Sequence, residues 1–199
     1  VWAARADVQR TLLRSRASGA LSATGPFLSV VTNDVGGSKL DYYQHRKVRY
    51  QAVSTGVAVD LGAGPQLEEE GTVTVSLTNK APAGLPAYVL FRLDDPDSPS
   101  GQSHSWVSVY LGPRTTLLRA TLDGRPVEVE SYVEKGLPVY SLFVKVDRGA
   151  TRELQLSIRQ PAVPDQPLIY RQQPLVRDDD VQVLRAGSDD PVRYTYAAR

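Results

Sequence analysis

The chain has 199 residues and a net charge of +1, with 41% hydrophobic and 23% charged residues and neither cysteine nor methionine. This composition is enough for one or two domains with a hydrophobic core and is unlike that of a disordered segment. The near-zero charge argues against a general basic surface for nucleic acid or an anionic membrane. The absence of cysteine excludes disulfides, thiolate metal sites and cysteine nucleophiles.

Residues 1–41 are expected to be the C-terminal remnant of an upstream α/β domain. Asp7 is placed to cap a short amphipathic helix, and Phe27–Val31 then has the pattern of a buried strand. No apolar run approaches the roughly 20 residues that span a bilayer, and the start of the chain does not resemble a signal peptide. We therefore expect a piece of a longer protein whose targeting segment precedes Val1.

Residues 42–160 carry the pattern of a β-sandwich. Thr72–Thr78 alternates strictly between apolar and hydroxyl side chains, which is typical of a half-buried strand. Asp123-Gly124 between two alternating runs predicts a tight hairpin, because both positions favour positive φ. Short strands separated by turns predict a mostly β fold, an antiparallel immunoglobulin-like sandwich with a short N-terminal α/β remnant.

Residues 161–199 differ in composition, since prolines interrupt the first part of this stretch. The segment is expected to be a proline-punctuated tail that lies against the sandwich and adds one or two strands. The two candidate strands are Leu168–Arg171 and Val181–Leu184. The aspartates Asp178–Asp180 have the character of loop residues.

A first group of candidate site residues surrounds a Gly-Gly turn and comprises Asp34, Lys39, Asp41, His45 and Arg46. If these side chains converge, they have the chemistry to bind a phosphate or a sugar, or to perform acid–base catalysis. The alternative is structural: Asp34 caps the turn, and Asp41 pairs with Arg46 or with the lysine after it. We favour the structural alternative, because strand alternation makes His45 and Arg46 point apart.

A second candidate is aromatic. Trp106 and Tyr110 lie on one face of a predicted strand with Ser108 between them. Flat rings in this arrangement are typical of sugar-binding platforms, but tryptophan is also common in a core. We favour the core interpretation here and keep both residues as binding candidates.

Neither a metal site nor a cofactor is predicted. The acidic loop Asp94–Ser98 contains the carboxylates that calcium prefers, but its spacing departs from known calcium loops, and an exposed loop is favoured. The two histidines, His45 and His104, are too few for a multi-histidine zinc site. No nucleotide-binding glycine motif is present.

Several stretches together resemble the C-terminal part of the actinobacterial domain-of-unknown-function family four thousand and twelve: Phe27–Asp34, Gly37–Tyr43 with His45-Arg46, Asn79–Pro82 with Gly84–Pro86 and Tyr88-Val89, Trp106–Tyr110 with Asp123-Gly124, and Val139–Ser141 with Phe143-Val144. The resemblance covers most of Phe27–Ile158. It implies a membrane-anchored cell-envelope protein with its bulk outside the cytoplasm. An N-terminal helix would anchor it, and a larger domain would precede Val1. The resemblance carries no catalytic residues to this chain.

The function expected first is that of a non-catalytic extracytoplasmic module of an envelope protein, which supports the upstream domain or binds an envelope protein or glycopolymer. Two alternatives stay open. One is the C-terminal half of an enzyme that acts on envelope glycan or its phosphate linkage, with Lys39, Asp41 and Arg46 contributing to the site. The other is a structural subunit of a surface assembly, with strand edges that pair between neighbours. Contact with a membrane is expected only through an anchor outside this chain.

Overall fold

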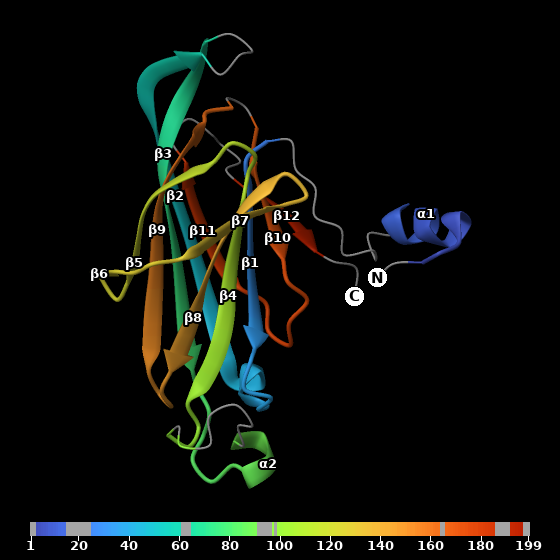
Figure 1. Ribbon diagram of the computed structural model, residues 1–199, viewed down its shortest axis with the longest axis vertical. Coiled ribbons are helices and arrows are strands. Elements are labelled where there is room, and N and C mark those ends of the chain that lie inside the picture. The colour runs from blue at the N-terminus through green and yellow to red at the C-terminus, as the bar shows by residue number, and fades with distance from the viewer. Residues whose placement is uncertain are drawn as a thin grey trace.

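The computed structural model describes residues 3–14, 25–60, 65–90, 97, 99–163, 166–185 and 192–196. These residues form two six-stranded sheets that lie face to face (Figure 1). Sheet A contains, in spatial order, β12 (Val192–Tyr196), β10 (Leu168–Gln172), β1 (Phe27–Asp34), β4 (Ser103–Leu111), β8 (Leu137–Val146) and β7 (Glu130–Glu134). Sheet B contains β11 (Asp180–Arg185), β2 (Gln44–Asp60), β3 (Pro65–Asn79), β9 (Thr151–Pro161), β5 (Thr116–Leu122) and β6 (Arg125–Pro126).

The core lies between the inner faces of the two sheets. In β3 the strict alternation buries Val73, Val75 and Leu77, as expected from the sequence. On the facing sheet, Val107 and Val109 of β4 are fully buried in the same cluster. Each of these side chains stabilises the fold by about 1.5–3 kcal/mol through removal of apolar surface from water.

The mostly β prediction is confirmed, but the prediction of purely antiparallel sheets is wrong. The parallel pairs are β1 with β10, β10 with β12, and β2 with β11. All of them involve strands of the C-terminal segment. The chain crosses from sheet A to sheet B between β1 and β2, and it crosses again in the same direction between β10 and β11. As a result, β10 runs parallel to β1 and β11 runs parallel to β2.

The C-terminal segment is therefore built into both sheets. We expected one or two added strands, and the described residues hold three, β10, β11 and β12. At the other end of the chain, β1 belongs to the part expected to close an upstream domain. The structure instead places β1 inside sheet A, where seven of its residues pair with β4 and two with β10. Burial explains this position, because Phe27, Leu28 and Val30 are at most 1% exposed.

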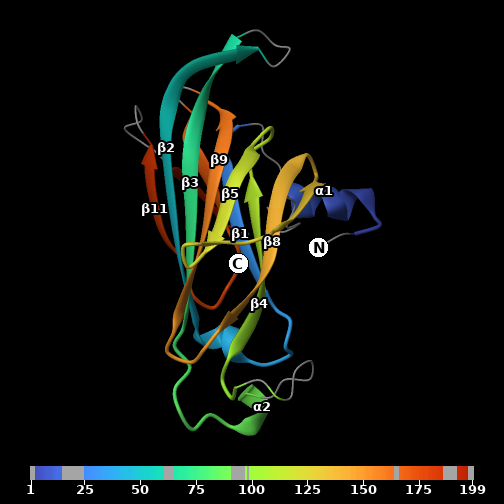
Figure 2. The same cartoon turned by 60° about the vertical axis from the view of Figure 1, so that its left-hand side comes forward.

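Three short helices accompany the sheets in the described residues. The predicted N-terminal helix is present as α1 (Ala6–Arg14), which lies to one side of the sandwich in both views and buries none of its residues (Figures 1 and 2). The 3-10 helix η1 (Leu40–Tyr43) connects β1 to β2, and α2 (Ala87–Leu90) follows β3. No helix in the described part of the chain is both long enough and apolar enough to cross a bilayer.

The tight hairpin predicted at Asp123-Gly124 is confirmed. The two residues have φ of 51° and 76° and connect β5 to β6. Lys135-Gly136 repeats the arrangement between β7 and β8, with φ of 52° and 81°. Glycine is favoured at the second position of each turn, because positive φ brings a Cβ close to the backbone. The β2–β3 hairpin, in contrast to these two tight hairpins, is long and projects beyond the rest of the sandwich (Figure 2).

Candidate functional site

The polar group predicted around the Gly-Gly turn does not converge. Asp34 caps the turn, as expected: one carboxylate oxygen accepts the Gly36 amide at 2.7 Å and the other accepts the Ser38 hydroxyl at 2.6 Å. Asp41 accepts the amide of the next residue, Tyr42, at 3.0 Å. The side chain of Lys39 is exposed, and its backbone amide donates to α2. These residues shape the turn and η1.

His45 and Arg46 point to opposite faces of β2, as strand alternation predicts. Arg46 points inward and is buried, whereas His45 lies on the outer face of sheet B. The predicted pairing of Asp41 with Arg46 or Lys47 is wrong. Arg46 pairs with Asp179, and Lys47 pairs with Asp180 at 3.3 Å, so the C-terminal segment supplies both partners.

The Arg46–Asp179 pair is the centre of a buried polar network that we call the lower clasp. Arg46 Nε and Nη2 donate to the two carboxylate oxygens of Asp179 at 2.6 and 2.8 Å, and the two side chains are 2% and 1% exposed. The Tyr170 hydroxyl also donates to Asp179. Burial and this carboxylate raise the pKa of Tyr170 well above its ordinary value. The network joins β2, β10 and the start of β11.

Gln173 completes the lower clasp from the end of β10. Its amide accepts the Thr32 backbone N–H at 2.9 Å and donates to the Thr32 carbonyl at 3.0 Å. It also accepts from Arg46 Nη1 at 3.0 Å. The Gln173 side chain thus takes the place of a backbone partner for Thr32 beyond the paired part of β10. Both the N–H and the carbonyl of Thr32 are hydrogen-bonded as a result.

A second buried network, which we call the upper clasp, lies farther along β2. Arg185 Nε donates to Glu69 at 3.1 Å, and the two side chains are 7% and 5% exposed. Gln160 donates to both Glu69 and the Tyr50 hydroxyl. Burial, followed by the charge of Glu69, raises the pKa of Tyr50. Arg185 also donates to the backbone carbonyls of Val163 and Gln166, which lie between β9 and β10. Through Glu69 and Gln160, the network ties β11 to β3 and β9.

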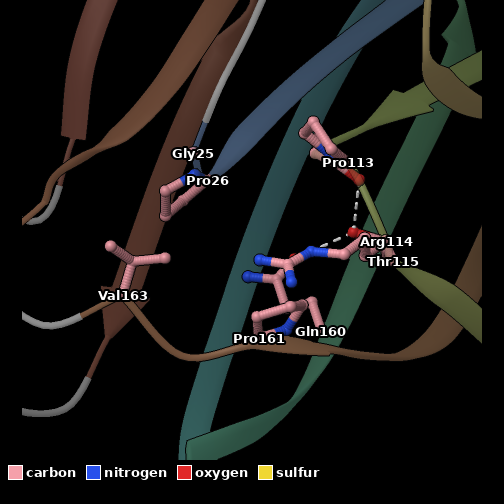
Figure 3. Close-up of a pocket in the computed structure, with 9 residues that line it drawn as sticks. Gly25, Pro26, Pro113, Arg114, Thr115, Gln160, Pro161 and Val163 are labelled. Atoms are coloured by element: carbon pink, nitrogen blue, oxygen red, sulfur yellow. Dashed lines mark hydrogen bonds between the residues drawn. The ribbon is translucent and has the colours of Figure 1, made fainter. Parts of the chain in front are cut away.

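A small cavity lies beside the upper clasp (Figure 3). It has a volume of about 60 Å³ and is lined by residues of three segments: Gly25-Pro26, Gly112–Thr115, and Gln160-Pro161 with Val163. Gly112 is required there, because a Cβ would lie 2.8 Å from the Gly25 carbonyl oxygen. The volume holds a few water molecules and is well below the roughly 300 Å³ of a small-molecule pocket.

A larger depression of about 280 Å³ lies over the middle of sheet B. It is lined by Gln51–Val53, Glu70–Thr72, Leu118 and Ser157-Ile158. Glu70, the carboxylate of this group, accepts a hydrogen bond from Arg159 at 2.8 Å. The lining therefore lacks the pair of ionisable groups that acid–base chemistry needs.

The aromatic candidates lie on the outer face of sheet A. Trp106 and Tyr110 are half-buried and stand outside the hydrophobic core, whereas Val107 and Val109 between them are fully buried inside it. The core interpretation of the two aromatics is therefore wrong. Strand alternation puts one of the two faces of β4 in the core, and the aliphatic face is the one that packs there.

Two further aromatic side chains, which the sequence did not single out, extend this surface. Phe143 of β8 pairs directly with Trp106, and Tyr132 of β7 pairs with Val139, the partner of Tyr110. Phe143 and Tyr132 are each 40% exposed. The alternation of β8, with Leu142 and Val144 in the core, was the signal that could have found Phe143. We call Trp106, Phe143, Tyr110 and Tyr132 the aromatic face.

Hydrogen bonds fix the strands beneath the aromatic face. Ser141 donates to Ser108 at 2.8 Å, and the Tyr132 hydroxyl lies 3.2 Å from the Ser141 hydroxyl. The Tyr110 hydroxyl donates to Glu134 at 2.8 Å, and burial together with this carboxylate raises the pKa of Tyr110. These contacts join β4, β8 and β7 and fix the positions of the two tyrosine hydroxyls.

Among the described residues, no group of three or more histidine, aspartate and glutamate side chains is placed to hold a metal ion. Most of the acidic loop considered for calcium, residues 94–96 and 98, lies outside the described residues.

Comparison with protein-family models and with curated proteins found no match to this chain. The resemblance stated from the sequence therefore stays a prediction.

Proposed function

We propose that this chain is a non-catalytic binding module that holds an envelope glycopolymer on the aromatic face of sheet A. The observation that supports the proposal is the direct pairing of Trp106 with Phe143, with Tyr110 and Tyr132 in a second row on the same face. Neither row contributes to the hydrophobic core.

The spacing of the rows fits an extended ligand. Trp106 and Tyr110 are four residues apart on β4, which corresponds to about 13 Å along the strand. Trp106 and Phe143 are direct cross-strand neighbours, with Cβ atoms roughly 4.5–5.5 Å apart. Two rows of rings at this distance would contact separate units of a polymer, because the flat apolar faces of sugar rings pack on aromatic surfaces.

The proposal includes the cell-envelope location and an immunoglobulin-like classification of the antiparallel strands. Both rest on the sequence resemblance and on the strand pattern. The same protein would contain an anchor and an upstream domain outside this chain. The enzyme alternative receives no support from the residues named for it, since Arg46 is buried in the lower clasp and Lys39 and Asp41 do not join it.

Affinity electrophoresis in gels that contain purified envelope polysaccharide tests the proposal. We expect the protein to be retarded, and Trp106→Ala and Phe143→Ala to weaken binding by about tenfold each, equivalent to ~1.4 kcal/mol of lost ring contact. Tyr88→Ala is the control, because Tyr88 is 73% exposed and lies on α2, which is not one of the strands of the aromatic face. Thermal unfolding verifies that each variant is folded.

Two results would contradict the proposal. One is equal retardation of the Trp106 and Phe143 variants and of the unchanged protein. The other is the absence of retardation by every polysaccharide fraction, which would favour a module that only supports its neighbouring domain.

A further inference from the structure

A cationic and aromatic cluster lies at the η1 end of sheet B and contains none of the residues of the aromatic face. It comprises Tyr42 and Tyr43 of η1, His45 at the start of β2, Lys80 after β3, and Arg177 in the segment that precedes β11. We call it the basic corner. The backbone connects its parts, because the Lys80 amide donates to the Tyr43 carbonyl at 3.0 Å.

Ring contacts hold the basic corner in shape. The Arg177 guanidinium lies over the Tyr42 ring, 5.4 Å from its centroid, and Tyr43 packs edge-on against Tyr42 with centroids 5.0 Å apart. Tyr42 remains 49% exposed, and both Lys80 and Arg177 are exposed. The cation–π contact orders the Arg177 side chain in advance. Binding of a ligand therefore costs less conformational entropy than it would with a freely rotating arginine.

Within the described residues, the charge of the basic corner is not balanced by ion pairs. Over the part of the chain that the structure describes, neither Lys80, Arg177 nor His45 forms an ion pair with a carboxylate. The nearest acidic residues in sequence are Asp41, next to Tyr42, and Asp178, next to Arg177. On the same face of β2, Lys47 is already paired with Asp180.

The same positive charges act on His45. Partial burial, followed by the positive charges of Lys80 and Arg177, lowers the pKa of His45 below its usual value of 6.5. The backbone supports the same grouping. His45 pairs with Thr78 of β3, two residues before Lys80, and Arg177 reaches this end of β2 through its contact with Tyr42.

We propose that the basic corner binds a phosphate ester, with Lys80 and Arg177 contacting the phosphate oxygens and His45 beside them. Arginine and lysine donors suit a compact dianion, and the exposed part of Tyr42 offers an apolar surface to the group that carries the phosphate. The proposal rests on residues outside the aromatic face and does not depend on glycopolymer binding there. It gives the module a second site for a charged saccharide component.

The test follows the His45 ring protons by NMR over a pH series, at constant ionic strength, with inorganic phosphate, glucose 1-phosphate or glucose. We expect both phosphates to raise the pKa of His45, because a bound anion stabilises the imidazolium, and glucose alone to have no effect. Tighter binding of glucose 1-phosphate than of inorganic phosphate would assign part of the affinity to the sugar.

Charge-removing variants complete the test. Lys80→Gln and Arg177→Gln should each weaken phosphate binding on the order of tenfold, as expected for loss of a charged hydrogen bond. Arg49→Gln is the matched control, since Arg49 lies on the same face of β2 as His45, about 13 Å away. Trp106→Ala should leave phosphate binding unchanged, which separates this proposal from the aromatic face.

An unchanged His45 pKa at the highest phosphate concentration would overturn the proposal. Equal effects of Lys80→Gln, Arg177→Gln and Arg49→Gln would also overturn it, because such a result indicates a general charge effect.

Discussion

The two clasps use the same chemistry with the roles of the partners exchanged. In the lower clasp the sandwich provides the arginine, Arg46, and the C-terminal segment provides the carboxylate, Asp179. In the upper clasp the sandwich provides the carboxylate, Glu69, and the C-terminal segment provides Arg185. In each, a buried tyrosine hydroxyl donates to the carboxylate. The segment is therefore attached by charges of both signs, which opposes a shift of β11 along β2.

The two clasps differ in how completely the charges are enclosed. The lower pair has two parallel hydrogen bonds and lies at 2% and 1% exposure. The upper pair has one hydrogen bond to Glu69, and the two terminal nitrogens of Arg185 each donate to a backbone carbonyl. The free-energy cost of a charge without its partner increases as the charge becomes less exposed to water. We therefore expect substitutions in the lower clasp to destabilise the protein more than substitutions in the upper clasp.

The largest effect is expected for Asp179→Asn. This change leaves the Arg46 charge buried without its counter-ion and should lower the free energy of unfolding by about 3–5 kcal/mol. Urea unfolding measures it. Asp180→Asn is the matched control, because Asp180 pairs at the surface with Lys47 and should cost less than about 1 kcal/mol. Equal losses for the two variants would contradict the role assigned to the lower clasp.

A smaller loss, about 2–3 kcal/mol, is expected for Arg185→Gln, since Glu69 keeps its hydrogen bonds from Gln160 and Tyr50. Arg159→Gln removes the same charge from an exposed pair with Glu70 and should cost less than about 1 kcal/mol. If Arg185→Gln destabilises the protein more than Asp179→Asn, the ranking of the two clasps is wrong.

The smallest effect concerns alkaline pH. The pKa of Tyr170 is raised in the folded protein, so its contribution to stability is complete below the unfolded pKa of about 10 and is lost as pH rises above it. Tyr170→Phe should therefore make the decline in unfolding free energy above pH ~10 shallower, by up to about 1.4 kcal/mol per pH unit. Urea unfolding between neutral and alkaline pH measures the slope. An unchanged slope, with the exposed Tyr88→Phe as control, would refute the assignment.

Strand positions were largely predictable. Buried strands reveal themselves through alternation, as in β3, and Asp123-Gly124 identified its hairpin through local backbone preference. The partners of the inward-pointing Arg46 were not predictable, because Asp179 is 133 residues away in sequence. Its neighbours, Asp178 and Asp180, have the same side chain, and nothing local distinguishes the one that is buried.

The candidate site shows the same division. Trp106 and Tyr110 were placed correctly on one face of a strand, but the sequence could not say which face meets the core. Phe143 joined them only through cross-strand register. In the basic corner, His45 was a candidate from the start, whereas Lys80 and Arg177 come from other segments and were missed.

The sequence by itself determined a mostly β chain, its turns, and the split of His45 and Arg46 onto opposite faces of a strand, because backbone preference and side-chain alternation are local properties. Only the tertiary structure decided that the C-terminal segment enters both sheets in parallel, that its charges are buried against Arg46 and Glu69, and that the aromatic side of β4 faces outward. These features depend on contacts between segments far apart in sequence, and such contacts form only when the whole hydrophobic core is buried.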